Sequence, residues 1–141
     1  MMKQLMHFIA GLPVCSEING GVTLDYSGGE YAGIALKAEP GQEILCRYLN
    51  GNSLLKRDFK IEMYYSFSGD SLESAKNHEL MEKLQEQICN TPPPYLSDDM
   101  EIIEINIADG GTSVKSAIGE GLLVFRFSVI YKKIGGGEEN D

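Results

Sequence analysis

Two histidines are the residues best able to act as general bases in this chain of 141 residues. A serine or cysteine nucleophile needs a base beside it, and only His7 and His78 offer an imidazole. Both lie in segments with helical periodicity. His78 is surrounded by charged residues, and His7 borders an apolar stripe where partial burial is expected. The sequence favours non-catalytic histidines, and we expect no catalytic residues and no enzyme activity.

Acidic residues provide the best candidate metal ligands, at Asp98, Asp99, Glu101 and Glu104. Metal binding needs several ligands that converge on one point. Alternate residues of a strand point to opposite faces, so Glu101 and Glu104 would diverge unless the strand bulged. A solvated acidic edge, which discourages unwanted strand pairing, is the simpler interpretation. We therefore expect no metal site.

The cysteine and glycine patterns predict no further site. Cys15, Cys46 and Cys89 are odd in number, widely spaced and without a Cys-x-x-Cys pair, which favours neither a disulfide framework nor a zinc site. A reducing cytoplasm is the simplest environment for such a chain. The glycine pairs match neither of the phosphate-binding patterns that join a strand to a helix, so we interpret them as turns. We expect no cofactor.

The composition is typical of one globular domain, which we place at residues 1–134, followed by a disordered acidic glycine-rich tail at residues 135–141. No apolar run approaches the roughly 20 residues that span a bilayer, so we expect a soluble protein with no membrane partner. The net charge is −9 and no basic cluster is present. This balance argues against sequence-specific nucleic-acid binding but is compatible with a pore through which DNA slides.

The longest regular element that the sequence predicts is a strand, and it should determine the position of any binding surface on the protein. Residues 54–67 alternate in sidedness over their whole length, which predicts a strand with one buried and one solvated face. The apolar face carries Leu55, Phe59, Ile61, Met63, Tyr65 and Phe67, and the polar face carries Lys56, Asp58, Lys60, Glu62, Ser66 and, as an aromatic exception, Tyr64. At about 3.3 Å per residue the strand would reach roughly 46 Å, so it should bend, bulge near Arg57 or overhang its neighbours.

The remaining elements are shorter. A helix is expected before Gly11 and Pro13, and Asp70 with Glu73 predicts a capped helix over residues 71–89. The apolar stripe of this second helix is predicted at Leu72, Ala75, Leu80, Leu84 and Ile88. Further strands are expected at residues 22–26, 34–38, 43–49, 101–107 and 122–132, with a turn at Asn50-Gly51 and a mobile connection over residues 108–121. This order predicts an α+β fold with a mainly antiparallel sheet and two helices packed on one face.

Three stretches of the chain resemble the small tail-terminator proteins of long-tailed bacteriophages and prophages, often labelled minor capsid proteins. They are EILCRYLNGNSLLKRDFKIEMYYSF, the following DSLESAKNHELMEKLQEQI and the closing FRFSVIYKK. The resemblance covers residues 1–134 and lies in patterns of sidedness and length. It implies a structural assembly protein that forms a ring, usually of six subunits. Such a ring caps the tail tube and joins it to the head connector.

The resemblance also implies partners and a location. The partners would be further copies of the chain, a tail tube protein and a head-completion protein, while DNA would only pass through the lumen. The location would be the virion tail, after assembly in the cytoplasm of a bacterial host.

A head-to-tail ring needs two different complementary patches on each subunit. Our hypothesis places one on the polar face of the long strand and the other on the mobile connection. The residues are Lys56, Lys60, Glu62 and Tyr64 on the strand, and Asp109, Lys115 and Glu120 on the connection. A solvated surface charge is the simpler interpretation of each charged residue.

Two other functions fit the same sequence. One is a small-molecule-binding or enzymatic α+β domain, in which a curved sheet and two helices enclose an apolar pocket. The other is an adaptor from a mobile element that uses the sheet for another partner.

Overall fold

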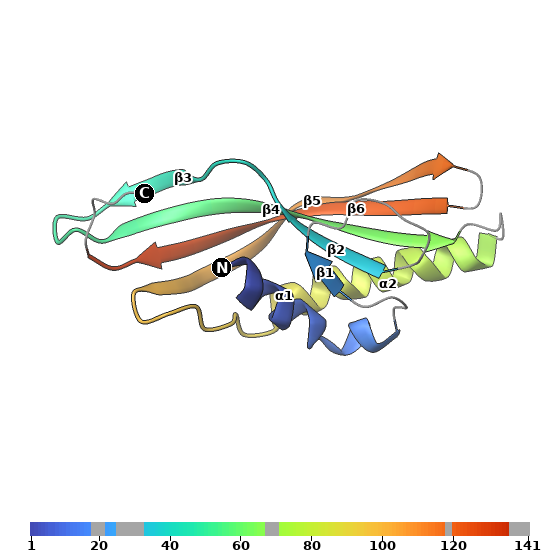
Figure 1. Cartoon of the computed structure of the whole chain (residues 1–141), viewed down its shortest axis with the longest axis horizontal. Helices are drawn as coiled ribbons and strands as arrows, with labels where there is room; N and C mark the ends of the chain where they lie inside the picture. The colour runs from blue at the N-terminus through green and yellow to red at the C-terminus, as the bar shows by residue number, and fades with distance from the viewer. Residues whose placement is uncertain (18–21, 25–32, 67–70, 118–119, 136–141) are drawn as a thin grey trace.

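A long, twisted sheet covered on one side by helices forms the protein (Figure 1). The computed structural model describes residues 1–17, 22–24, 33–66, 71–117 and 120–135. The elements in chain order are α1 (Met2–Ala10), the 3-10 helix η1 (Pro13–Glu17), β1 (Val22–Leu24), β2 (Gly33–Ala38), β3 (Glu43–Arg47), β4 (Ser53–Ser66), α2 (Ser71–Asn90), β5 (Met100–Ala117) and β6 (Glu120–Lys133). The predicted α+β class with a mainly antiparallel sheet is confirmed. The predicted cap at Asp70 and the tail beyond Gly135 lie outside the described residues.

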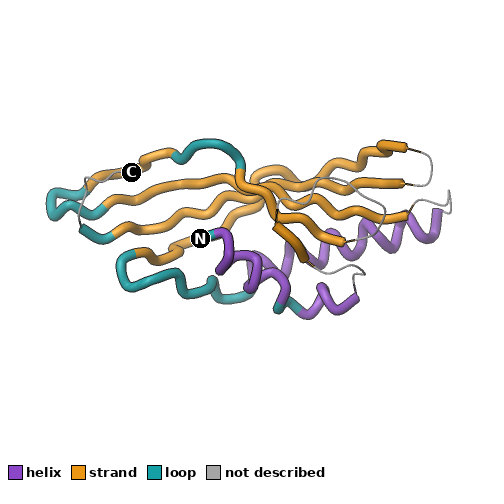
Figure 2. The backbone as a smooth tube through the Cα atoms, in the orientation of Figure 1, coloured by secondary structure: helices purple, strands orange, loops and turns teal. Residues whose placement is uncertain are grey.

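The sheet is built around β4. Its strand order is β1-β2-β4-β6-β5, and all described pairings are antiparallel except the parallel pair of β1 and β2. Because β6 occupies one edge of β4 along its whole length, β2 and β3 share the other edge. There β3 pairs with residues 53–56 and β2 with residues 59–64. Figure 2 shows the loop of residues 39–42 that separates these two strands.

Of the three alternatives expected for the long strand, a bulge near Arg57 is wrong on the β6 side, because β4 pairs with β6 from Ser53 to Ser66 without a shift in register. Arg57 lies on the apolar face, opposite Val129, and its guanidinium stands 5.6 Å from the centroid of the Phe59 ring. A long arginine stem covers apolar surface while its charged end stays over an aromatic ring. A charged residue therefore fits on this face without disturbing the alternation.

The predicted mobile connection at residues 108–121 is also wrong. Strand β5 continues to Ala117, and β6 begins at Glu120, so nearly all of this segment is a long hairpin. The register shifts between Asp109 and Thr112, around two glycines, and again between Val114 and Ala117. Glycines in a strand commonly mark such bulges, and the alternating residues of β6 supply a complete partner strand. Residues 108–117, although rich in glycine and small polar residues, therefore form a strand because they pair with β6.

The helices and one face of the sheet enclose a single apolar cluster. Helix α1 contributes Leu5 and Ile9, and the phenyl rings of Phe59 and Phe127 stack with centroids 5.5 Å apart. Helix α2 contributes Leu80, Met81, Leu84 and Ile88. Burying one such side chain contributes about 1.5–3 kcal/mol before entropy is counted. The predicted stripe of α2 needs one correction, because Ala75 is exposed and Met81 is buried.

The helix layer covers only part of the sheet. Figure 1 shows α1 and α2 below the end that carries β1 and β2, whereas the end that carries β3 extends beyond both helices. We call this end, formed by β3 and the paired parts of β4, β6 and β5, the projecting half. Strand β4 therefore does not overhang its neighbouring strands; the sheet as a whole extends past the helices.

Candidate functional site

Three of the seven predicted interface residues lie on β4 with described side chains, and they are less exposed than the alternation indicated. Lys56 and Lys60 are half-buried, and Glu62 is buried. The carboxylate of Glu62 accepts Lys37 Nζ at 2.7 Å and Lys60 Nζ at 3.2 Å. Glu62 and Lys60 therefore form contacts within the subunit. The interpretation of Glu62 as a solvated charge is wrong.

The backbone register locates the other four predicted residues. Tyr64 lies opposite Gly33 and Leu122, Asp109 opposite Arg126, and Glu120 opposite both Ser66 and Ala117. Lys115 belongs to β5, next to Val114. The side chains of all four lie outside the described residues, so their role as an interface stays a prediction. The register nevertheless places Tyr64, Lys115 and Glu120 at the end of the sheet opposite Lys56.

The projecting half carries a second group of residues that the sequence reasoning missed. Every residue from 43 to 50 is exposed, although this segment is rich in apolar side chains. The large exposed ones are Ile44, Leu45, Tyr48 and Leu49. Alternation identified this segment as a strand but gave no sign that neither of its faces is covered. We call residues 43–56, comprising β3, its turn and the start of β4, the β3–β4 hairpin.

Hydrogen bonds hold the turn of this hairpin in one conformation. The amide of Tyr48 donates to the carbonyl of Asn52 at 2.8 Å, and the amide of Gly51 donates to the carbonyl of Tyr48 at 3.0 Å. Gly51 has a φ of 92°, which confirms the turn predicted at Asn50-Gly51. The side chain of Asn52 also accepts the amide of Gly135 at 2.9 Å. Leu49, which is fully exposed, is therefore presented by an ordered turn.

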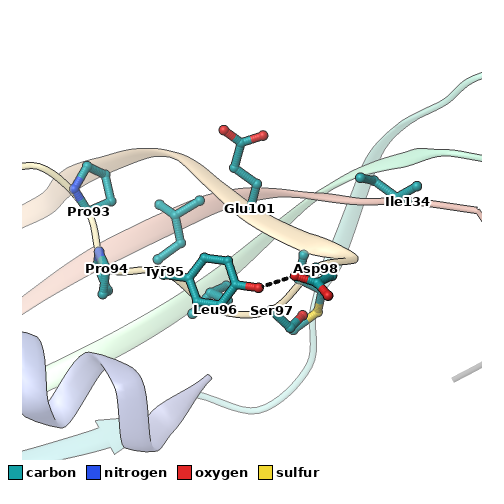
Figure 3. Close-up of a pocket in the computed structure, with 10 residues that line it drawn as sticks. Pro93, Pro94, Tyr95, Leu96, Ser97, Asp98, Glu101 and Ile134 are labelled. Carbon is teal, nitrogen blue, oxygen red and sulfur yellow. Dashed lines mark hydrogen bonds between the residues drawn. The ribbon is translucent and has the colours of Figure 1, made fainter.

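A groove with both apolar and polar lining residues lies at the other edge of the projecting half, between the segment before β5 and the end of β6. Its volume is about 490 Å³. Figure 3 shows its lining residues, which are Pro93, Pro94, Tyr95, Leu96, Ser97, Asp98, Met100, Glu101, Ile102 and Ile134. Leu96 and Ile102 are buried, whereas Tyr95 is 71% exposed and Ile134 is 47% exposed. We call this feature the edge groove.

Polar contacts fix the wall of the edge groove. The hydroxyl of Tyr95 donates to the carboxylate of Asp98 (Figure 3), and this bond, followed by burial and the charge of Asp99, raises the pKa of the phenol. The amide of Ile134 donates to the carbonyl of Asp99 at 2.8 Å, and the side chain of Gln4 donates to the carbonyl of Leu96 at 3.3 Å. The groove is therefore attached to both β6 and α1.

The edge groove and the β3–β4 hairpin differ in charge. The residues that line the groove include two carboxylates, Asp98 and Glu101, and no basic residue. The lining is therefore negative, and Lys132 and Lys133 at the end of β6 are not part of it. The β3–β4 hairpin has Glu43, Arg47 and Lys56, so it is net positive in a chain whose overall charge is −9. The two features are thus of opposite charge.

Further observations on the described residues concern the other kinds of site that the sequence brought into question. Both histidines are exposed, and no three potential metal ligands among the described residues gather into one group. The helices in this part include none that is long and apolar enough to cross a membrane. The predicted alternative required an apolar pocket between sheet and helices, but the described side chains there form the packed core, and the edge groove lies at the margin of the sheet.

Comparison with known proteins identifies a similar fold. No protein-family model matches the chain, and no similar sequence was found among curated proteins. Among solved structures, a chain of the structure described as "Virion of native gene transfer agent (GTA) particle" is similar, with a TM-score of 0.61. The similarity covers 90% of this chain and 91% of that chain, at 11% sequence identity. The chain therefore shares its overall fold with a component of a virion-like particle.

Proposed function

We propose that this protein is a structural, non-enzymatic component of a phage-like particle and acts as a tail terminator. Copies of the chain form a closed ring, usually of six subunits, that caps the tail tube and joins it to the head connector. The fold similarity to a chain of a gene transfer agent virion over nine-tenths of its length supports this class. The resemblance of residues 1–134 to tail terminators supports the specific role.

One observation carries the proposal, namely the two unlike surfaces at opposite edges of the projecting half. Across this half the strand order is β3-β4-β6-β5, with the β3–β4 hairpin at one edge and the edge groove at the other. A subunit with the same patch on both sides of a two-fold axis forms a closed dimer. Two different patches instead favour head-to-tail contacts, which generate rings or filaments.

The proposed partners follow from this role. They are further copies of the chain, a tail tube protein on one side of the ring and a head-completion protein on the other, with assembly in the host cytoplasm and a final location in the virion. DNA passes through the lumen without specific contacts. The net charge of −9 supports this point, because a negative surface repels the phosphate backbone.

Light scattering coupled to size exclusion and negative-stain microscopy test the proposal. The purified protein should form rings at high concentration or on addition of tail tubes from a related phage-like particle, and the tubes should stop growing once capped. Bovine serum albumin at equal concentration is the control for non-specific effects on the tubes. A protein that stays monomeric at every concentration and does not bind tubes contradicts the proposal.

A further inference from the structure

We propose that the β3–β4 hairpin of one subunit binds in the edge groove of the next copy of this chain, and that this contact closes the ring. The inference rests on the proposed function, because it specifies the subunit interface of that ring. The occupant of the groove is the turn of the hairpin, with Tyr48 and Leu49 inserted between Tyr95 and Ile134 of the neighbouring subunit.

The hairpin has the properties of an interface element. An exposed edge strand with apolar side chains promotes pairing with other chains, and proteins usually protect such edges with charges or bulges. Strand β3 has a register shift between Ile44 and Cys46, but the large apolar residues remain on its surface. Its turn is already ordered by the hydrogen bonds of Tyr48 and Gly51. Little conformational entropy is therefore lost when it binds.

The edge groove has a size and composition that suit the turn. Its volume of about 490 Å³ falls within the range of about 300–1,000 Å³ that is common for binding pockets. Leu96 and Ile102 form an apolar floor, and the ring of Tyr95 and the side chain of Ile134 stand at its rim. A tyrosine such as Tyr48, buried in a well-packed pocket, is a common source of interface binding energy, and Leu49 adds buried apolar surface.

Charge complementarity selects a second copy as the occupant. The hairpin is net positive and presents Arg47, which is exposed, beside its apolar turn. The lining of the groove is net negative, with Asp98 and Glu101 among its residues. Glu101 is exposed and points away from the Tyr95–Asp98 pair (Figure 3), so its carboxylate is available at the rim. Opposite charges at the rim orient the approach of the two subunits.

In this structure the hairpin does not occupy the groove of its own subunit, because Tyr48 and Leu49 at its turn are exposed. Two strands, β4 and β6, separate β3 from β5, which corresponds to about 14 Å at the usual strand spacing. The occupied groove therefore belongs to another subunit. Each copy donates one hairpin and accepts one, which is the arrangement of a head-to-tail ring.

A charge-swap experiment tests this contact. Arg47→Glu and Glu101→Arg should each raise the concentration at which half of the protein is assembled by tenfold or more, measured by sedimentation velocity. The double variant should recover most of the wild-type value, because it restores opposite charges across the interface. Glu101→Arg leaves the Tyr95–Asp98 hydrogen bond in place. Lys76→Glu, an exposed residue of α2, is the matched control and should assemble as the wild type does.

A mixing experiment tests the head-to-tail arrangement. Leu49→Asp disables the hairpin, and Ile134→Asp disables the groove, so neither variant should form rings alone. A mixture of the two keeps one intact hairpin and one intact groove and should yield a complex of one copy of each. Both changes replace exposed residues, and thermal melting close to that of the wild type verifies that the variants fold.

The outcomes separate this inference from the function on which it rests. If rings form but Leu49→Asp does not affect them, or if the charge-swap double variant is no better than either single variant, the hairpin contact is wrong and the ring stands. If the mixture gives no complex while the wild type forms rings, the contact is also wrong. A wild-type protein that never assembles overturns both.

Discussion

Replacing Glu62 with glutamine should destabilise the fold by about 2 kcal/mol and leave assembly intact. Its side chain is 9% exposed, and its carboxylate contacts Lys37 and Lys60, whose side chains are 23% and 24% exposed. Breaking a buried ion pair costs about 3–5 kcal/mol, whereas an exposed pair contributes about 0.2–1 kcal/mol. Because both ammonium groups can turn toward water after the change, the expected cost lies between these limits.

Chemical denaturation measures this cost, and thermal melting should show a decrease in Tm of about 6–10 °C for a domain of this size. Glu82→Gln removes the same charge from the exposed surface of α2 and should stay within about 0.5 kcal/mol of the wild type. Assembly is followed by size exclusion under conditions where both variants are folded. A Glu62→Gln protein that melts like the wild type but fails to assemble would show that Glu62 acts at the interface between subunits and not in an ion pair within one subunit.

Two further predictions concern the core and the thiols. Phe59→Ala should cost about 3–5 kcal/mol in a denaturant titration, because the buried ring stacks on Phe127, and a loss below 1 kcal/mol would contradict this packing. Burial raises the pKa of Cys15 from 9.0 to about 11, so at pH 8 a thiol reagent should label the exposed Cys46 and Cys89 rapidly and the half-buried Cys15 much more slowly. The folded protein favours the neutral thiol, so the stability that Cys15 contributes is complete below pH 9 and decreases as the pH rises toward 11. Equal labelling rates for all three thiols in the folded protein would contradict the labelling prediction.

Periodicity in the sequence was sufficient to predict the helix and the long strand that build most of the core. The strand β4, the helix α2 and the turn at Asn50-Gly51 each depend on local rules, and the structure confirms these three elements with small changes at their ends. These rules also gave the fold class. They failed at residues 108–117, because two glycines and several small polar residues favour a loop locally, whereas pairing with β6 extends the strand.

The candidate interface was harder to predict because it depends on which surfaces remain uncovered. Alternation assigned Glu62 to a wet face, but the cross-strand neighbours Lys37 and Lys60 enclose it. The strand predicted at residues 43–49 corresponds to β3, yet its apolar residue Ile44 is exposed, and the end of the sheet that carries β3 extends beyond both helices. Coverage of a sheet face is set by how far the helix layer extends, and no local pattern in the sequence contains that information.

The contrast between β2 and β3 is the strongest argument that the projecting half is built for contact with another chain. Both strands pair with the same edge of β4, and both are rich in apolar residues. Residues 33–36 of β2 are buried, and those of β3 are all exposed. The apolar side chains of β3 therefore contribute little to folding of the single subunit, and exposing them favours aggregation. The exposure of β3 and its small contribution to folding are both explained if a neighbouring subunit covers this strand. That subunit would then bury β3 in the way that the rest of the chain buries β2.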